Sequence, residues 1–191
     1  LAHMGLRYES PSTHVVADPR NTAALASRIL EHWGARPRKL IGLHISARKP
    51  SQRWPAANFA EVAKDLHRAA GASFLLLWAP GASDDRLHPG DDGKAQTMIA
   101  EMAGLPVLPV PTQRLEELIA ALAQCDEVIC CDGGAMHLAA ALGKPIVCLF
   151  GHSDAARWHP WGAPYELLQK DTRQVADIAP REASAAYARL L

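Results

Sequence analysis

The 191-residue sequence lacks the features that tie a chain to a membrane, a metal or a nucleic acid. Its 20 lysines and arginines balance 20 aspartates and glutamates, so net charge provides no general attraction to nucleic acid or to an anionic lipid surface. No apolar run approaches the roughly 18 residues that a spanning helix needs, and no secretory signal is visible. A composition that is 49% hydrophobic and 21% charged is typical of a globular protein.

The four cysteines do not have the spacing of a zinc site. Cys130 and Cys131 are adjacent in one apolar run, and Cys148 lies in another. We therefore expect buried, reduced thiols, which suit a reducing compartment such as the cytoplasm. The two histidines of loop 151–163 are irregularly spaced and have no further ligand cluster nearby, so we predict neither a metal nor another cofactor.

The chain divides into a short polar segment and one domain. Residues 1–4 look like the remnant of an expression tag, and residues 5–18 are polar and irregular. We interpret residues 1–18 as tag remnant and inter-domain linker, and residues 19–191 as a single domain of ordinary size.

Predicted strands and helices alternate along this domain. The expected strands are 39–45, 73–78, 105–110, 128–131, 145–150 and 165–168. The expected helices are 19–33, 55–70, 94–102, 115–123, 135–142 and 180–191, with Leu115, Leu118, Ile119 and Leu122 on the inner face of the fourth. The alternation predicts an α/β fold, a Rossmann-like doubly wound parallel sheet with helices on both faces. Ligands of such sheets bind outside the carboxyl ends of the strands, which points to the loops that follow strands.

The stretch CDGGAMH, residues 131–137, is the first candidate site. Asp132 closes a strand, and Gly133 and Gly134 turn directly into a helix. Unpaired amides at a helix start attract anions, and glycine allows a phosphate to approach them closely. His137 would lie one turn into the helix, beside the same anion. Asp132 could cap the helix or accept hydrogen bonds from sugar hydroxyls, and a purely structural turn is an equal alternative.

A basic, hydroxyl-containing loop is the second candidate. No acidic residue occurs between Glu31 and Glu61, and Ser46, Arg48, Lys49 and Arg53 lie in this interval. Hydroxyls can bind phosphate oxygens and the cations can neutralise them. The alternative is a solvated loop, and in either case we expect Trp54 to pack in the core.

Together these stretches resemble a known family. The segment DGGAMHLAAALGKPIVCLFG, followed by a Trp-x-Pro segment, and the upstream Arg53-Trp54-Pro55 are similar to the signatures of glycosyltransferase family 9, the bacterial heptosyltransferases of lipopolysaccharide core synthesis. The resemblance covers about residues 38–165. It implies a GT-B fold of which this chain is the C-terminal, donor-binding half.

The resemblance also implies separate functions for the two halves of the enzyme. The donor-binding half would hold an ADP-sugar such as ADP-heptose, for inverting transfer to a lipopolysaccharide core acceptor bound by the N-terminal half. The catalytic base would lie in that other half, so this chain alone would be inactive. The partners would be a nucleotide-sugar and the acceptor, not nucleic acid, and we expect a monomer in the cytoplasm or at the inner membrane face.

By the same resemblance, the amides of Gly133 and Gly134 and the ring of His137 would hold the pyrophosphate, Asp132 would face the sugar, and Ser46 would contact phosphate. The family lysine that faces phosphate falls on Gln52, for which Lys49, Arg53 or, less directly, Arg48 could substitute. A second hydroxyl position falls on Ala47. A family acid after the second strand falls best on Asp84 or Asp85.

The sequence leaves two other classes of function open. The chain could be a nucleotide-sugar-binding module without catalysis, a reading that the missing lysine favours. It could also be another enzyme of the GT-B type, such as a nucleotide-sugar epimerase, which would hold a diphosphate at the same kind of turn.

Overall fold

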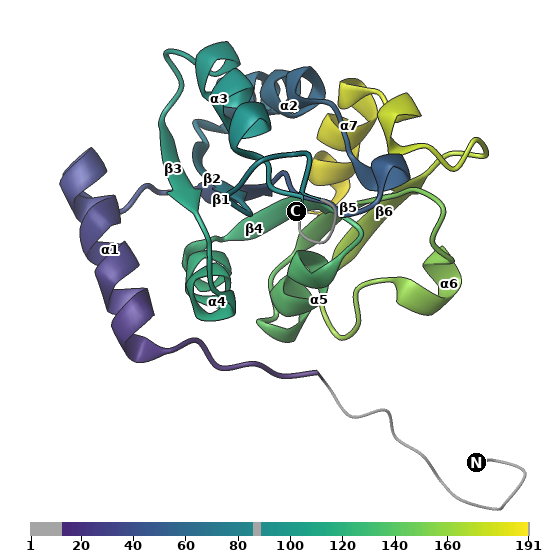
Figure 1. Cartoon of the computed structure of the whole chain (residues 1–191). Helices are drawn as coiled ribbons and strands as arrows, with labels where there is room; N and C mark the ends of the chain where they lie inside the picture. Colours follow the sequence, from purple (N-terminus) through teal and green to yellow (C-terminus); the bar gives the residue numbers. More distant parts are fainter. Residues whose placement is uncertain (1–12, 86–88, 191) are drawn as a thin grey trace, which may run out of the picture.

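A computed structural model describes residues 13–85 and 89–190. Its centre is a six-stranded sheet in the order β3-β2-β1-β4-β5-β6, in which all neighbouring strands are parallel (Figure 1). The strands are β1 (Leu40–His44), β2 (Ser73–Trp78), β3 (Val107–Pro111), β4 (Glu127–Cys131), β5 (Ile146–Phe150) and β6 (Tyr165–Gln169). This is the predicted doubly wound Rossmann-like sheet.

The helices cover both faces of the sheet. In Figure 1, α2 (Ala56–Ala70), α3 (Asp92–Glu101) and α7 (Pro180–Leu190) lie above it, and α4 (Leu115–Gln124) and α5 (Gly134–Ala141) lie below. Helix α1 (Pro19–Trp33) is seen at the left and packs against α4, on the same side of the sheet. The shorter elements are η2 (Pro50–Gln52), α6 (Ala155–Trp158) and η3 (Val175–Asp177). Because both faces are covered, β1, β2, β4 and β5 are buried along their whole length.

The strand order reverses between β1 and β4. The chain first builds outward through β2 and β3, then returns and builds in the opposite direction through β4, β5 and β6. The loops after β1 and β4 consequently diverge at the carboxyl edge of the sheet and leave a crevice between them, which is where open α/β sheets bind ligands.

Local sequence signals explain where several elements begin and end. The Asp18 side chain accepts a hydrogen bond from the Asn21 amide and caps α1, which ends at Gly34 with φ 76°. Gly71, with φ 62°, ends α2 in the same way. Glycine adopts these left-handed angles without steric cost, so both helix ends agree with the prediction.

The core contains the residues expected there, with one correction. Trp54 is fully buried and its indole donates to the carbonyl of Ile178, and all four cysteines are buried and free. Leu115, predicted on the inner face of its helix, is 59% exposed. Leu115 is the first residue of α4, and the helix begins there beyond the edge of the apolar layer. A second difference is the short helix α6, which lies within the expected loop 151–163.

Candidate functional site

A large cleft lies at the reversal point of the sheet. It has a volume of about 1040 Å³ and is bordered by the segments that follow β1, β2, β3, β4 and β5. Of the predicted site residues, it is lined by Ser46, Arg48, Lys49, Asp132, Gly133 and Gly134. Two candidate stretches that lie about 80 residues apart in sequence therefore form one site.

The glycine turn leaves a helix start open toward this cleft. Gly133 is the N-cap of α5, and no side chain of a described residue caps the helix. The Met136 amide donates to the carbonyl of Gly133 at 3.2 Å, so the amides of Gly134 and Ala135 are those that remain available to an anion, and the helix dipole favours negative charge there. The prediction that Asp132 could cap the helix is not met, because its carboxylate accepts from Gln52 instead.

Neither glycine of the turn is required by the protein's own packing. A Cβ added at Gly133 or Gly134 would meet no atom within 4 Å, and neither residue has a left-handed φ angle. At nearby Gly151, by contrast, a Cβ would lie 2.3 Å from the carbonyl oxygen of Ser51. The space at the turn is therefore free, which is what close approach of a ligand to the backbone requires.

Asp132 and its neighbours form the floor of the cleft. Asp132 and Gln52 are both buried, and the Gln52 amide donates to Asp132 Oδ2 and, over 2.9 Å, to Ser153 Oγ. His137 is exposed and does not line the cleft. The centre of its ring lies 6.3 Å from that of Trp158, a residue that lines the cleft.

The basic loop divides into exposed and paired cations. Arg48 and Lys49 are exposed on the cleft, and Ser46 lines it while its Oγ accepts from the Ala79 amide at 2.9 Å. Arg53 does not line the cleft. Its guanidinium pairs with the buried Asp91 and donates to the carbonyl of Ala47, so it holds the loop in shape.

Several lining residues have no counterpart in the sequence predictions. Asp84 and Asp85 are exposed and do not line the cleft, whereas Asp92 does. The Asp92 carboxylate accepts from the Trp78 indole at 2.7 Å and from the Gly81 amide at 3.0 Å, which fixes the segment after β2. The available signal is an acidic pair at the start of a helix, with Asp91 as the N-cap and Asp92 as the first helical residue. The remaining lining residues not predicted are Ala47, Gln52, Ala79, Pro80, Gly81, Pro89, Thr112, Gln113, Ser153 and Trp158.

A buried histidine and a partly buried lysine lie next to the loop. Burial, with a further contribution from the charge of Lys94, lowers the pKa of His44 to about 4. His44 Nδ1 has no hydrogen-bond partner among the described residues. Lys94 donates to the carbonyl of Ile45 at 2.8 Å, and burial lowers the pKa of its amine. The imidazole of His44 is consequently neutral at pH 7.

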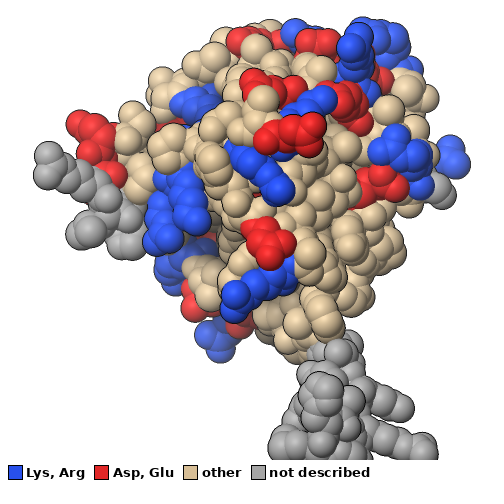
Figure 2. Space-filling view, turned by 90° about the vertical axis from the view of Figure 1, so that its right-hand side faces the viewer, with Lys and Arg blue, Asp and Glu red and all other residues tan. Residues whose placement is uncertain are grey.

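No part of the described chain offers a membrane span or a metal cluster. Over residues 13–85 and 89–190, no helix is long and apolar enough to cross a membrane, and no group of three His, Cys, Asp or Glu residues could hold a metal ion. On the face shown in Figure 2, basic and acidic side chains are intermingled over much of the surface, with basic ones gathered at the left.

The fold is that of an open, doubly wound α/β protein with a cleft where the strand order reverses, and comparison with known proteins specifies the family. Residues 3–185 match the model of glycosyltransferase family 9 (heptosyltransferase). The chain belongs to this family.

Individual relatives agree with the family assignment. Lipopolysaccharide heptosyltransferase 2 of Salmonella typhimurium is 35% identical over 117 residues, which are 61% of this chain and 32% of that protein. A crystal structure of a glycosyl transferase family 9 protein from Veillonella parvula superposes with a TM-score of 0.77 at 25% identity, over 93% of this chain and 53% of that one. ADP-heptose LPS heptosyltransferase II of Escherichia coli gives a TM-score of 0.75 at 22% identity, over 98% and 56%. The chain thus spans about half the length of these two solved structures. Its match to the Salmonella relative covers about a third of that protein.

Proposed function

We propose that this chain is the donor-binding domain, the C-terminal half, of a GT-B heptosyltransferase. It holds an ADP-sugar, ADP-heptose in the first instance, for inverting transfer to a lipopolysaccharide core acceptor. The family assignment and the names of its heptosyltransferase relatives support the class of reaction. The position of the cleft, at the reversal point of the sheet, supports the binding of a nucleotide there.

The single observation that carries the proposal is the open start of α5. Gly133 and Gly134 line the cleft, their missing side chains would meet no protein atom, and no described side chain caps the helix. Free amides, a positive helix end and unobstructed space together form a site for a diphosphate.

The other lining residues have complementary parts in this proposal. Arg48 and Lys49 neutralise the diphosphate from the exposed rim, and the Ser46 hydroxyl donates to it while still accepting from Ala79. Arg53 contributes by pairing with Asp91 and keeping the loop folded. During transfer, negative charge develops on the departing ADP, and the same amides and cations stabilise it.

Transfer also needs a base for the acceptor hydroxyl. We place this base, and the acceptor site, in a further domain of the parent protein. The chain by itself is therefore expected to bind donor without transferring sugar, and no metal takes part in the proposed reaction.

Calorimetric titration with ADP tests the proposal directly. We expect the chain to bind ADP and a Gly134→Asp variant to lose at least about tenfold in affinity, because a carboxylate would occupy the anion site and repel the diphosphate. Gly93→Asp is the matched control. It adds the same side chain to the first turn of α3, in equally open space, at a residue that does not line the cleft.

Equal loss of binding in both variants would assign the effect to overall charge and contradict a phosphate site at α5. Absence of ADP binding to the unmodified chain, when the intact parent protein binds it, would mean that the site needs more than this domain. Absence in both would overturn the proposed function.

A further inference from the structure

Gln52 joins three of the loops that meet at the floor of the cleft. It ends η2 in the loop after β1, and its side-chain amide donates to Asp132 after β4 and to Ser153 after β5. Only 6% of the residue is exposed. Because one –NH2 group supplies both bonds, the amide is fixed in position and orientation.

The contact with Gln52 fixes Asp132 without neutralising it. Across the described residues, no lysine, arginine or histidine forms an ion pair with this carboxylate. Within residues 13–85 and 89–190, the side-chain donor to Asp132 is the neutral amide of Gln52. The carboxylate also acts on its surroundings, since burial and, in part, the charge of Asp132 raise the pKa of the Cys131 thiol to about 11. A negative charge therefore lies next to the proposed phosphate-binding turn.

This arrangement affects two ligands of one nucleotide differently. The terminal phosphate of a free nucleoside diphosphate loses a second proton with a pKa of about 6, so it carries close to two negative charges at pH 7. In a nucleotide-sugar that phosphate is esterified and keeps only one charge. The sugar also brings hydroxyl groups, which can donate hydrogen bonds to a carboxylate.

We propose that Gln52, by holding Asp132 with a neutral donor, makes the cleft select an esterified nucleoside diphosphate over a free one. Gln52 is thus a specificity-determining residue that acts through Asp132. The selection favours exchange of the spent diphosphate for a new donor molecule. The inference rests on the proposed donor-binding function.

The test compares the affinities of ADP-glucose and ADP, measured by calorimetry at pH 7.5, as a ratio. In Gln52→Lys an ammonium group would neutralise the charge of Asp132. We then expect the affinity for ADP-glucose relative to that for ADP to fall about fivefold, which is the effect of one added positive charge several ångströms from the phosphate. Asp132→Asn removes the charge and keeps an oxygen that accepts from Gln52, so the ratio should fall in the same direction.

Gln96→Lys is the matched control, because it makes the same substitution at an exposed residue of α3 that does not line the cleft. Its ratio should equal that of the unmodified chain. Thermal unfolding of each variant verifies folding, and Asp132→Asn carries the test if Gln52→Lys does not fold.

The outcomes separate this inference from the function on which it rests. If both ligands bind the unmodified chain but the ratio is unchanged in the folded variants, selection by charge is wrong and donor binding stands. If the Gln96→Lys ratio falls equally, the effect is one of net charge and the inference is also wrong. If neither ligand binds the chain or its parent protein, the proposed function itself fails.

Discussion

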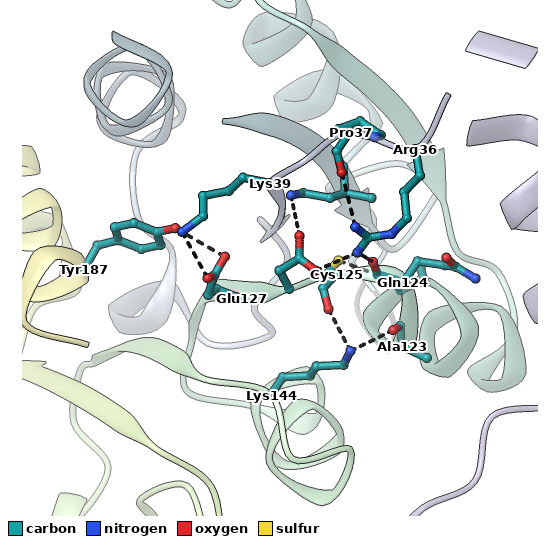
Figure 3. A network of polar contacts seen from close by, with 12 residues as sticks. Arg36, Pro37, Lys39, Ala123, Gln124, Cys125, Glu127, Lys144 and Tyr187 are labelled. Atoms are coloured by element: carbon teal, nitrogen blue, oxygen red, sulfur yellow. Dashed lines mark hydrogen bonds and ion pairs between the residues drawn. The ribbon is translucent and has the colours of Figure 1, made fainter. Parts of the chain in front are cut away.

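The two ends of the central strand pair, β1 and β4, use basic side chains in opposite ways. At the amino end, Lys39 pairs with the buried Glu127 at 3.3 Å, and the hydroxyl of Tyr187 from α7 donates to the same carboxylate at 3.2 Å (Figure 3). At the carboxyl end, Arg48 and Lys49 are exposed and form no ion pair with a described residue. The amino end is closed by contacts within the protein, and the carboxyl end is open.

The helix termini at the two ends differ in the same way. The last carbonyls of α4 are bound by cations: Lys144 donates to the carbonyls of Ala123 and Cys125 at 2.7 Å, and Arg36 to that of Gln124 at 3.1 Å (Figure 3). These cations also suit the negative end of the helix dipole. The start of α5 has no such partner among the described residues. The terminal carbonyls of α4 are thus hydrogen-bonded within the protein, whereas the start of α5 is left open where we propose that the diphosphate binds.

The largest expected effect concerns pH and the buried end of β1. Because the pKa of His44 is about 4 in the folded protein and 6.5 when unfolded, the unfolded chain binds more protons between these values. The free energy of unfolding should therefore fall by about 3 kcal/mol from this group as pH drops from 6.5 to 4, and be unaffected by it above pH 6.5.

Urea unfolding of the unmodified chain and of His44→Leu over this pH range measures the difference in slope. His152→Gln removes an exposed histidine and is the control. A His44→Leu profile parallel to that of the unmodified chain would show that His44 is not the group responsible.

A smaller effect is expected at the amino end. Lys39→Met leaves the carboxylate of Glu127 buried with only Tyr187 as a donor. We expect a loss of about 2 kcal/mol of unfolding free energy, less than for a fully buried pair, because a quarter of the Lys39 side chain is exposed. ADP affinity should stay the same.

The comparison with Arg36→Met sharpens this prediction. The Arg36–Asp126 pair is more exposed, so its loss should cost no more than about 1 kcal/mol. Equal costs for the two variants, measured by urea unfolding, would contradict the special importance of the buried carboxylate.

The smallest effect on stability is expected at the carboxyl end. Lys49→Met removes an exposed cation, so the free energy of unfolding should change by less than about 0.5 kcal/mol. The affinity for ADP should nevertheless fall about fivefold, since one charge opposite the diphosphate is lost. A Lys49→Met protein that binds ADP normally, or is clearly destabilised, would remove the contrast between the two ends.

Much of the fold could be predicted because its signals are local. Apolar runs bounded by Gly71 and by Gly34 gave strand and helix positions within a few residues of those observed. The prediction failed for Leu115, where helical periodicity continues one residue beyond the layer that buries it. Periodicity predicts which side chains lie on the same face of a helix. Whether such a side chain is buried depends on how far the neighbouring element extends along that face.

The candidate site could be predicted only in part, for the same reason. The glycine turn and the basic loop are recognisable in sequence, because their residue types are unusual at a strand end. The sequence does not reveal that Arg53 pairs with Asp91, 38 residues away. It also does not reveal the hydrogen bond from Gln52 to Asp132, 80 residues away. No local pattern indicates which cation will be paired and which will be free.

The sequence by itself determined the alternation of strands and helices, the family and the segments that could hold an anion. The tertiary structure alone decided the strand order and, with it, that the loops after β1 and β4 border one cleft. It also decided that Lys49 is exposed there while Arg53 is paired. The physical reason is that residue type and spacing act along the chain, whereas charge pairing and burial depend on distances that only the packed sheet establishes.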